Sequence, residues 1–167
     1  MNTAVSPQWE LHPQLANDTV AVGNLALSCV LASRDANYPW LVLVPRRAGV
    51  IEIIDLDEAD QRELWGEILL IARVLRALTH CDKLNMAAIG NVVPQLHIHV
   101  VARRRTDAAW PKPMWGAVPA IPYAPGALEQ FVTAVRKAAG AMVTERFMLP
   151  EDAESAIAAA DASDVLR

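Results

Sequence analysis

The sequence of 167 residues has no long hydrophobic run, few cysteines and no excess of positive charge. No stretch approaches the roughly 18 apolar residues of a membrane-spanning helix, so we expect no membrane span. The two cysteines, Cys29 and Cys81, are too few for a disulfide framework, and their apolar neighbours favour buried, reduced thiols. A formal net charge of −4 argues against broad, non-specific nucleic-acid binding, although a local pocket can still hold a small anion.

The first residues, MNTAVSPQWELHPQL, also lack a basic start followed by an apolar run, so we predict no signal peptide. Together with the missing membrane span and the reduced cysteines, this predicts a cytoplasmic protein. The length suits one domain with a full core, and the sequence shows no internal repeat.

Short apolar runs separated by turn residues predict a sheet of about five strands. A long helix follows the third run, because Asp55, Asp57 and Asp60 suit a helix N-terminus. Apolar residues then recur at three- and four-residue spacing to about Thr79, and a shorter helix is predicted around residues 128–135. This order predicts an α+β fold with an antiparallel sheet, and it lacks the strand–helix repeat and glycine-rich turn of a Rossmann fold. The predicted strands are Thr19–Val22, Leu25–Leu31, Trp40–Val44, Lys83–Ile89 and Val92–Arg103.

Residues 1–140 form the predicted domain, and residues 141–167 form an alanine-rich, acidic C-terminal tail. That composition predicts a peripheral helix or a partly disordered segment. Residues 104–125 are rich in proline and tryptophan and predict an ordered loop. Within this loop we interpret Trp110–Gly116 as a packed cover in preference to a gate over a substrate.

The last predicted strand carries the residues with chemical potential. Because side chains alternate along a strand, Gln95, His97 and His99 share one face, with about 7 Å between alternate residues. The apolar side chains between them point to the other face, toward the core. The strand therefore presents an amide and two imidazoles side by side.

Two imidazoles on one strand face have three interpretations. They can be partly exposed histidines whose hydrogen bonds are satisfied by the structure. They can hold a metal ion, although zinc needs further ligands and no cysteine or carboxylate lies at suitable local spacing. They can also serve covalent catalysis, because a neutral imidazole is a nucleophile near pH 7 and a second one can move a proton. Alternation alone does not choose among the three.

Residues 95–101, Gln-Leu-His-Ile-His-Val-Val, resemble the histidine-triad (HIT) motif, His-φ-His-φ-His-φ-φ, with glutamine in the first histidine position. The Leu41–Arg46 strand, the long helix, the Gly90-Asn91 approach and a Trp-Pro segment after the motif fall where HIT proteins have theirs. The likeness covers residues 10–138 and resembles a bacterial HIT-like subgroup with a Gln-x-His-x-His signature. It implies a HIT-like α+β fold, a homodimer with a continuous sheet, and hydrolase or transferase chemistry on nucleotide phosphates.

The resemblance also implies residue roles. His97 takes the position of the nucleophile that forms a nucleotidyl-histidine intermediate, and His99 the position beside the α-phosphate. Gln95 takes the place of a neighbour that orients the nucleophile, but an amide cannot exchange a proton as histidine does. Trp40 stands where many family members have a further histidine. The candidate substrate contacts are Asn91, Asn85, Ser33 and Trp40.

The implied reaction cleaves a nucleoside polyphosphate, dinucleotide or nucleotide conjugate at the α-phosphate, and it requires no metal or cofactor. The alternative is a nucleotide-binding protein with little or no turnover, which the glutamine at position 95 favours. Arg103, Arg104 and Arg105 can stabilise charge on the transferred group, but we favour a solvated basic strand end.

Overall fold

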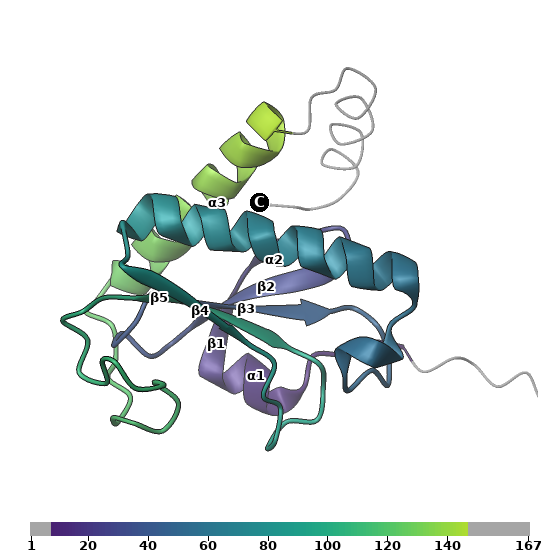
Figure 1. Cartoon of the computed structure of the whole chain (residues 1–167), viewed down its shortest axis with the longest axis horizontal. Helices are drawn as coiled ribbons and strands as arrows, with labels where there is room; N and C mark the ends of the chain where they lie inside the picture. Colours follow the sequence, from purple (N-terminus) through teal and green to yellow (C-terminus); the bar gives the residue numbers. More distant parts are fainter. Residues whose placement is uncertain (1–7, 147–167) are drawn as a thin grey trace, which may run out of the picture.

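The computed structural model describes residues 8–146, and its framework is a five-stranded sheet (Figure 1). The strand order is β1-β2-β3-β5-β4, and all neighbouring strands are antiparallel. The predicted α+β architecture is therefore confirmed. The strands are β1 (Thr19–Asn24), β2 (Ser28–Ser33), β3 (Trp40–Pro45), β4 (Lys83–Ala87) and β5 (Ile98–Arg103). The helices are α1 (Pro13–Asp18), α2 (Glu58–Thr79) and α3 (Ala127–Arg146), with a 3-10 turn at Ile53–Asp55.

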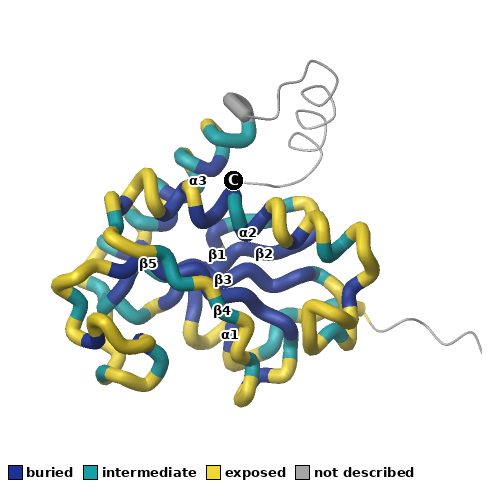
Figure 2. The backbone as a smooth tube through the Cα atoms, viewed as in Figure 1, coloured by how far each residue is buried: buried dark blue, intermediate teal, exposed yellow. Residues whose placement is uncertain are grey.

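Both faces of the sheet are covered. In Figure 1, α2 and α3 lie on one side and α1 on the other. Leu41 and Leu43 of β3 pack into the apolar cluster under α2, whereas the alternating Val42 and Val44 pack with Leu15 of α1. As a result β2, β3 and β5 are buried along almost their whole length (Figure 2).

The long helix begins and ends where its sequence predicts. The Asp57 side chain caps the N-terminus by accepting a hydrogen bond from the backbone N–H of Asp60. His80 ends the helix in the left-handed conformation, with φ of 48°. In the middle of the helix, the buried carboxyl of Glu67 accepts hydrogen bonds from the backbone N–H groups of Leu27 and Ser28, so α2 also holds the β1–β2 turn.

The strand predicted over Val92–Arg103 is wrong in its first half, because β5 begins at Ile98. Pro94 has no N–H to donate to a strand ladder. The N–H of Leu96 donates instead to the carbonyl of Val50, with an N–O distance of 3.0 Å. The first of the two predicted histidines therefore precedes the strand.

Two further differences lie near the N-terminus. The strand predicted over Leu25–Leu31 spans Ser28–Ser33, because residues 25–27 form the turn. Helix α1 was not predicted, although a proline at the first helical position is a helix-start signal. The Nδ1 of His12 accepts a hydrogen bond from the N–H of Gln14 at 3.1 Å.

Helix α3 runs through residue 140, where we predicted the domain to end. The first residues of the predicted tail thus continue this helix, and residues 147–167 lie outside the described residues. Within residues 8–146, no helix is long and apolar enough to cross a membrane.

Candidate active site

The two histidines of the sequence motif meet at the start of β5. The ring centroids of His97 and His99 are 4.8 Å apart and the ring planes cross at 88°. The residues are 6% and 9% exposed, and both line one cavity of about 430 Å³. The expected juxtaposition therefore holds, although one histidine lies on the strand and the other just before it.

The hydrogen bond of His97 determines where its proton lies. Its Nδ1 is 2.7 Å from the backbone carbonyl of Gln95. A carbonyl oxygen only accepts, so Nδ1 carries the hydrogen of the neutral ring and Nε2 keeps a lone pair. An imidazole held in this tautomer has its free nitrogen available for nucleophilic attack.

His99 adopts the opposite tautomer. The indole N–H of Trp40 donates to Nδ1 of His99 at 3.1 Å, and an indole nitrogen can only donate. Nδ1 therefore carries no hydrogen, and the neutral ring holds its proton on Nε2. Burial, together with the neighbouring His97, lowers the pKa of His99 from 6.5 to about 4. At pH 7 this ring is a neutral hydrogen-bond donor.

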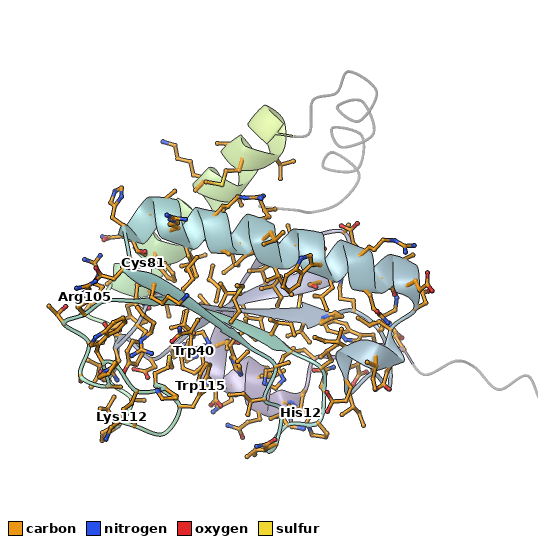
Figure 3. All side chains as sticks on the ribbon, in the orientation of Figure 1. His12, Trp40, Cys81, Arg105, Lys112 and Trp115 are labelled. Carbon is orange, nitrogen blue, oxygen red and sulfur yellow. The ribbon has the colours of Figure 1, made fainter. Side chains whose placement is uncertain are left out.

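Aromatic and α1 residues form the walls of the cavity beside the histidines. The Trp115 ring centroid lies 5.9 Å from that of His99, and Figure 3 shows Trp40 and Trp115 on the side of the sheet opposite α2. Among residues 8–146, no Lys or Arg lines this cavity, and Asp18 contributes a carboxylate to it. The lining residues are Gln14, Leu15, Asp18, Thr19, Ser33, Trp40, Val42, residues 89–93, His97, His99 and Trp115.

Of the other predicted site residues, three line this cavity and two do not. Ser33, Asn91 and Trp40 line the cavity. Asn85 does not, because it lies on β4 and its Oδ1 accepts a hydrogen bond from Arg103 at 2.8 Å. The side chain of Gln95 bonds to the N-terminal segment and lines a second, smaller cavity of about 240 Å³ that also borders His97.

Of the three arginines at the end of β5, the first, Arg103, is buried. Arg103 is 1% exposed, and its Nε donates to the Asp107 carboxylate at 2.7 Å. It also donates to the carbonyl of Lys112 and lies 5.3 Å from the ring centroid of Tyr38. Arg103 thus anchors the 104–125 loop, and it is absent from both cavities that border His97. Our interpretation of it as a solvated residue is wrong, because β5 is covered on both faces.

Several functional residues were missed. The α1 residues Gln14, Leu15 and Asp18 reach the cavity, and recognising the helix start at Pro13 would have placed them on one short helix. Trp115 also lines the cavity, so the loop that we interpreted as a packed cover contributes a side chain to the site. No local signal marks that contact.

Among residues 8–146, no group of three or more His, Cys, Asp or Glu side chains is arranged to hold a metal ion. The two cysteines are free thiols, Cys29 buried and Cys81 half-buried. Burial raises the pKa of Cys29 to about 11, which keeps it an unreactive thiol.

Comparisons with known proteins agree with this fold. The family model described as HIT domain matches residues 14–106. A histidine triad protein from Bradyrhizobium japonicum is 52% identical, with a TM-score of 0.78 over 79% of this chain and 98% of that one. A histidine triad protein from Sinorhizobium meliloti 1021 is 37% identical, with a TM-score of 0.76 over 78% and 96%. A third, from Marinobacter aquaeolei VT8, is 36% identical, with a TM-score of 0.78 over 81% and 98%.

A search among curated proteins returned no match. The matched family model spans more than half of the chain, and the similar structures cover most of it. The chain belongs to the HIT domain family.

Proposed function

We propose that the protein is a nucleotide hydrolase or nucleotidyl transferase that acts at an α-phosphate through a covalent intermediate on His97. The observation that carries this proposal is the hydrogen bond from Nδ1 of His97 to the Gln95 carbonyl, which leaves Nε2 with a free lone pair. The family membership supports the same reaction class. The resemblance of residues 95–101 to the Gln-x-His-x-His signature of a HIT-like subgroup also supports it.

The reaction proceeds by two displacements. Nε2 of His97 attacks the α-phosphorus, the bond from phosphorus to the leaving group breaks, and the leaving group departs with its electron pair and takes up a proton. Water then attacks the phosphorus and loses a proton to solvent, the N–P bond breaks with its electron pair returning to Nε2, and the nucleoside monophosphate leaves. In a transferase, another hydroxyl or amine takes the place of water. The scheme requires no cofactor, because the nucleophile is a side chain.

Neutral donors stabilise the developing negative charge. His99 is uncharged at pH 7 and carries its proton on Nε2, so it can donate to a phosphoryl oxygen without a large reorganisation. The Asn91 amide lines the same cavity and provides a second donor. The apolar side chains of Leu15, Val42 and Trp115 provide a surface for the nucleoside.

The alternative is a nucleotide-binding protein with little turnover. One observation favours it: the Gln95 amide bonds to residues 10 and 12, so the first triad position supplies no titratable group beside His97. Both functions use the same cavity. They differ only in whether His97 forms a bond to phosphorus that is later broken.

The test uses a fluorogenic adenosine phosphoramidate and diadenosine polyphosphates as substrates. We expect turnover by the wild-type protein and its loss in His97→Ala, with a phosphoamidate adduct on His97 seen by mass spectrometry of rapidly quenched reactions. His80→Asn is the matched control, because His80 is an exposed histidine at the end of α2. AMP binding by the wild type without turnover of either substrate would favour the binding protein, and equal turnover by His97→Ala would contradict the proposed mechanism.

We also propose that the protein is a cytoplasmic homodimer joined at β4. Within residues 8–146, this strand pairs with β5 on one side and with no strand on the other, so its other edge presents unpaired backbone groups. Met86 on β4 and the nearby Ile89 are 44% and 40% exposed. Pairing of β4 with a second copy satisfies the edge and buries these side chains.

A further inference from the structure

We propose that Gln95 is a positioning residue that fixes the α1 wall of the cavity relative to the nucleophile. Its Oε1 accepts from the backbone N–H of His12 at 2.9 Å, and its Nε2 donates to the backbone carbonyl of Glu10 at 2.9 Å. These contacts join parts of the chain that are 83 and 85 residues apart. The inference rests on the proposed function, since it assigns a role within that cavity.

The two contacts copy a pattern found between strands. In a parallel sheet, one residue bonds to the carbonyl of one partner residue and to the N–H of the partner two positions later. The Gln95 side chain makes the same pair of bonds to Glu10 and His12. One glutamine side chain therefore takes the place of one residue of a neighbouring strand.

The amide of glutamine suits this pair of hydrogen bonds better than the side chain of histidine or glutamate does. Its oxygen accepts and its NH₂ donates toward the same side. The two ring nitrogens of a histidine point apart, so one imidazole cannot bond to both backbone groups. A glutamate offers two acceptors and no donor, so it can hold His12 but repels the Glu10 carbonyl. The glutamine that replaces the first triad histidine is thus matched to the N-terminal segment of this chain.

The clamped segment leads directly into the cavity wall. His12 precedes α1, and its Nδ1 and carbonyl accept hydrogen bonds from the N–H groups of Gln14 and Ala16. α1 then supplies Leu15 and Asp18 to the cavity. The packing of Trp9 and Leu11 against the cluster that contains Leu15 holds the same segment on the sheet.

The other end of the same residue holds the nucleophile. The backbone carbonyl of Gln95 accepts from Nδ1 of His97 at 2.7 Å. Gln95 therefore ties His97 through its main chain and α1 through its side chain. Loss of the side-chain contacts leaves the main-chain contact to His97 in place, so it loosens nucleotide binding more than it slows the chemical step.

The test compares Gln95→Met and Gln95→Glu with Gln61→Met as the matched control. Gln61 makes a similar bond, from Nε2 to the carbonyl of Leu56 at 2.7 Å, but it lies on α2 and does not line the cavity. Three readouts are used: hydrogen exchange of the His12 and Ala16 amides, the Kd for AMP, and kcat and KM for the fluorogenic adenosine phosphoramidate.

For Gln95→Met we expect exchange at His12 to become at least about tenfold faster, and Kd and KM to rise by about five- to tenfold, with kcat changed by less than about threefold. Gln95→Glu keeps an acceptor for His12, so we expect slower exchange there than in Gln95→Met and an intermediate rise in KM. Gln61→Met should match the wild type in all three readouts.

Unchanged exchange at His12 in Gln95→Met would overturn the proposal. So would faster exchange with unchanged Kd for AMP, or a fall in kcat as large as the rise in KM. Failure of the proposed function looks different: a wild-type protein that neither binds AMP nor turns over the phosphoramidate contradicts that function, while the exchange rates of His12 and Ala16 still decide whether Gln95 holds α1.

Discussion

At the scale of single residues, the site depends on two imidazoles that hold their protons on different nitrogens. The carbonyl of Gln95 selects the tautomer of His97, and the indole of Trp40 selects that of His99. The resemblance to HIT proteins predicts that Trp40 takes the place of a further histidine. The indole N–H of Trp40 can only donate, whereas an imidazole can donate or accept, so Nδ1 is the acceptor nitrogen of the neutral His99 ring.

Replacement of Trp40 by phenylalanine tests this role. Trp40→Phe keeps an aromatic ring in the cavity wall but removes the donor to His99, so the ring is free to change tautomer. We expect ¹⁵N NMR to show a mixture of tautomers at His99 and turnover to fall by about tenfold. Trp65→Phe is the control, because Trp65 lies on α2 and is 58% exposed. A single unchanged tautomer with wild-type turnover would contradict the assignment.

The pKa of His99 predicts a pH dependence of stability. The pKa is about 4 in the folded protein, against 6.5 for a free histidine, so the unfolded chain binds the proton first as pH falls. The free energy of unfolding therefore falls as pH drops from 6.5 to 4. The contribution of His99 to this loss is about 3 kcal/mol at pH 4. Urea unfolding at several pH values measures it. His99→Gln should remove this part of the acid sensitivity and His80→Asn should not; equal slopes for wild type and His99→Gln would disprove the prediction.

At the scale of elements, one buried cation organises the 104–125 loop, which brings Trp115 to the site. We expect Arg103→Met to cost about 3–5 kcal/mol, because it leaves the Asp107 carboxylate without its buried partner. Arg105→Met should change the unfolding free energy by less than about 0.5 kcal/mol, because its side chain is 80% exposed. Chemical denaturation measures both, and limited proteolysis of Arg103→Met should show new cleavage within the loop. Similar losses for both variants would refute the anchoring role.

The long helix is joined to the β1–β2 turn by a carboxyl that is costly to ionise. Burial raises the pKa of Glu67, so the unfolded chain ionises at a lower pH than the folded protein. The stabilisation by this carboxyl is therefore present at acidic pH. It is lost as pH rises from 4.5 through the raised pKa of Glu67 in the folded protein. Glu67→Gln keeps an acceptor for the Leu27 N–H and cannot ionise, so we expect higher stability than wild type at pH 8. Glu129→Gln, at an exposed position of α3, is the control; lower stability of Glu67→Gln at pH 8 would contradict the prediction.

At the scale of the whole molecule, the open edge of β4 predicts the oligomeric state. We expect analytical ultracentrifugation of the wild type to give twice the chain mass of 18.2 kDa. Met86→Glu places a charge on the exposed edge strand and should shift the protein to a monomer. Ile121→Glu is the control, because Ile121 is 50% exposed in the 104–125 loop. A monomeric wild type, or a dimeric Met86→Glu variant, would reject pairing through β4.

Local patterns were sufficient for much of the fold. The N-cap aspartate and the three- and four-residue apolar spacing located α2, and short apolar runs located β1 and β3 closely. The boundaries of β2 and β5 were wrong, because turn residues and a proline interrupt apolar runs that continue on either side. An apolar run shows that a segment is buried but does not show which backbone groups pair.

For the site, the sequence by itself determined that His97 and His99 lie together, because residues two positions apart in an extended chain keep to the same side. Only the tertiary structure decided which nitrogen of each ring is free, that Gln95 holds the N-terminal segment, and that Arg103 anchors a loop. The two contacts of the Gln95 side chain join residues that are 83 and 85 positions apart in the sequence. Local propensity encodes neither these contacts nor the Trp40–His99 bond across 59 positions, because they form only when separate elements have packed against the same sheet.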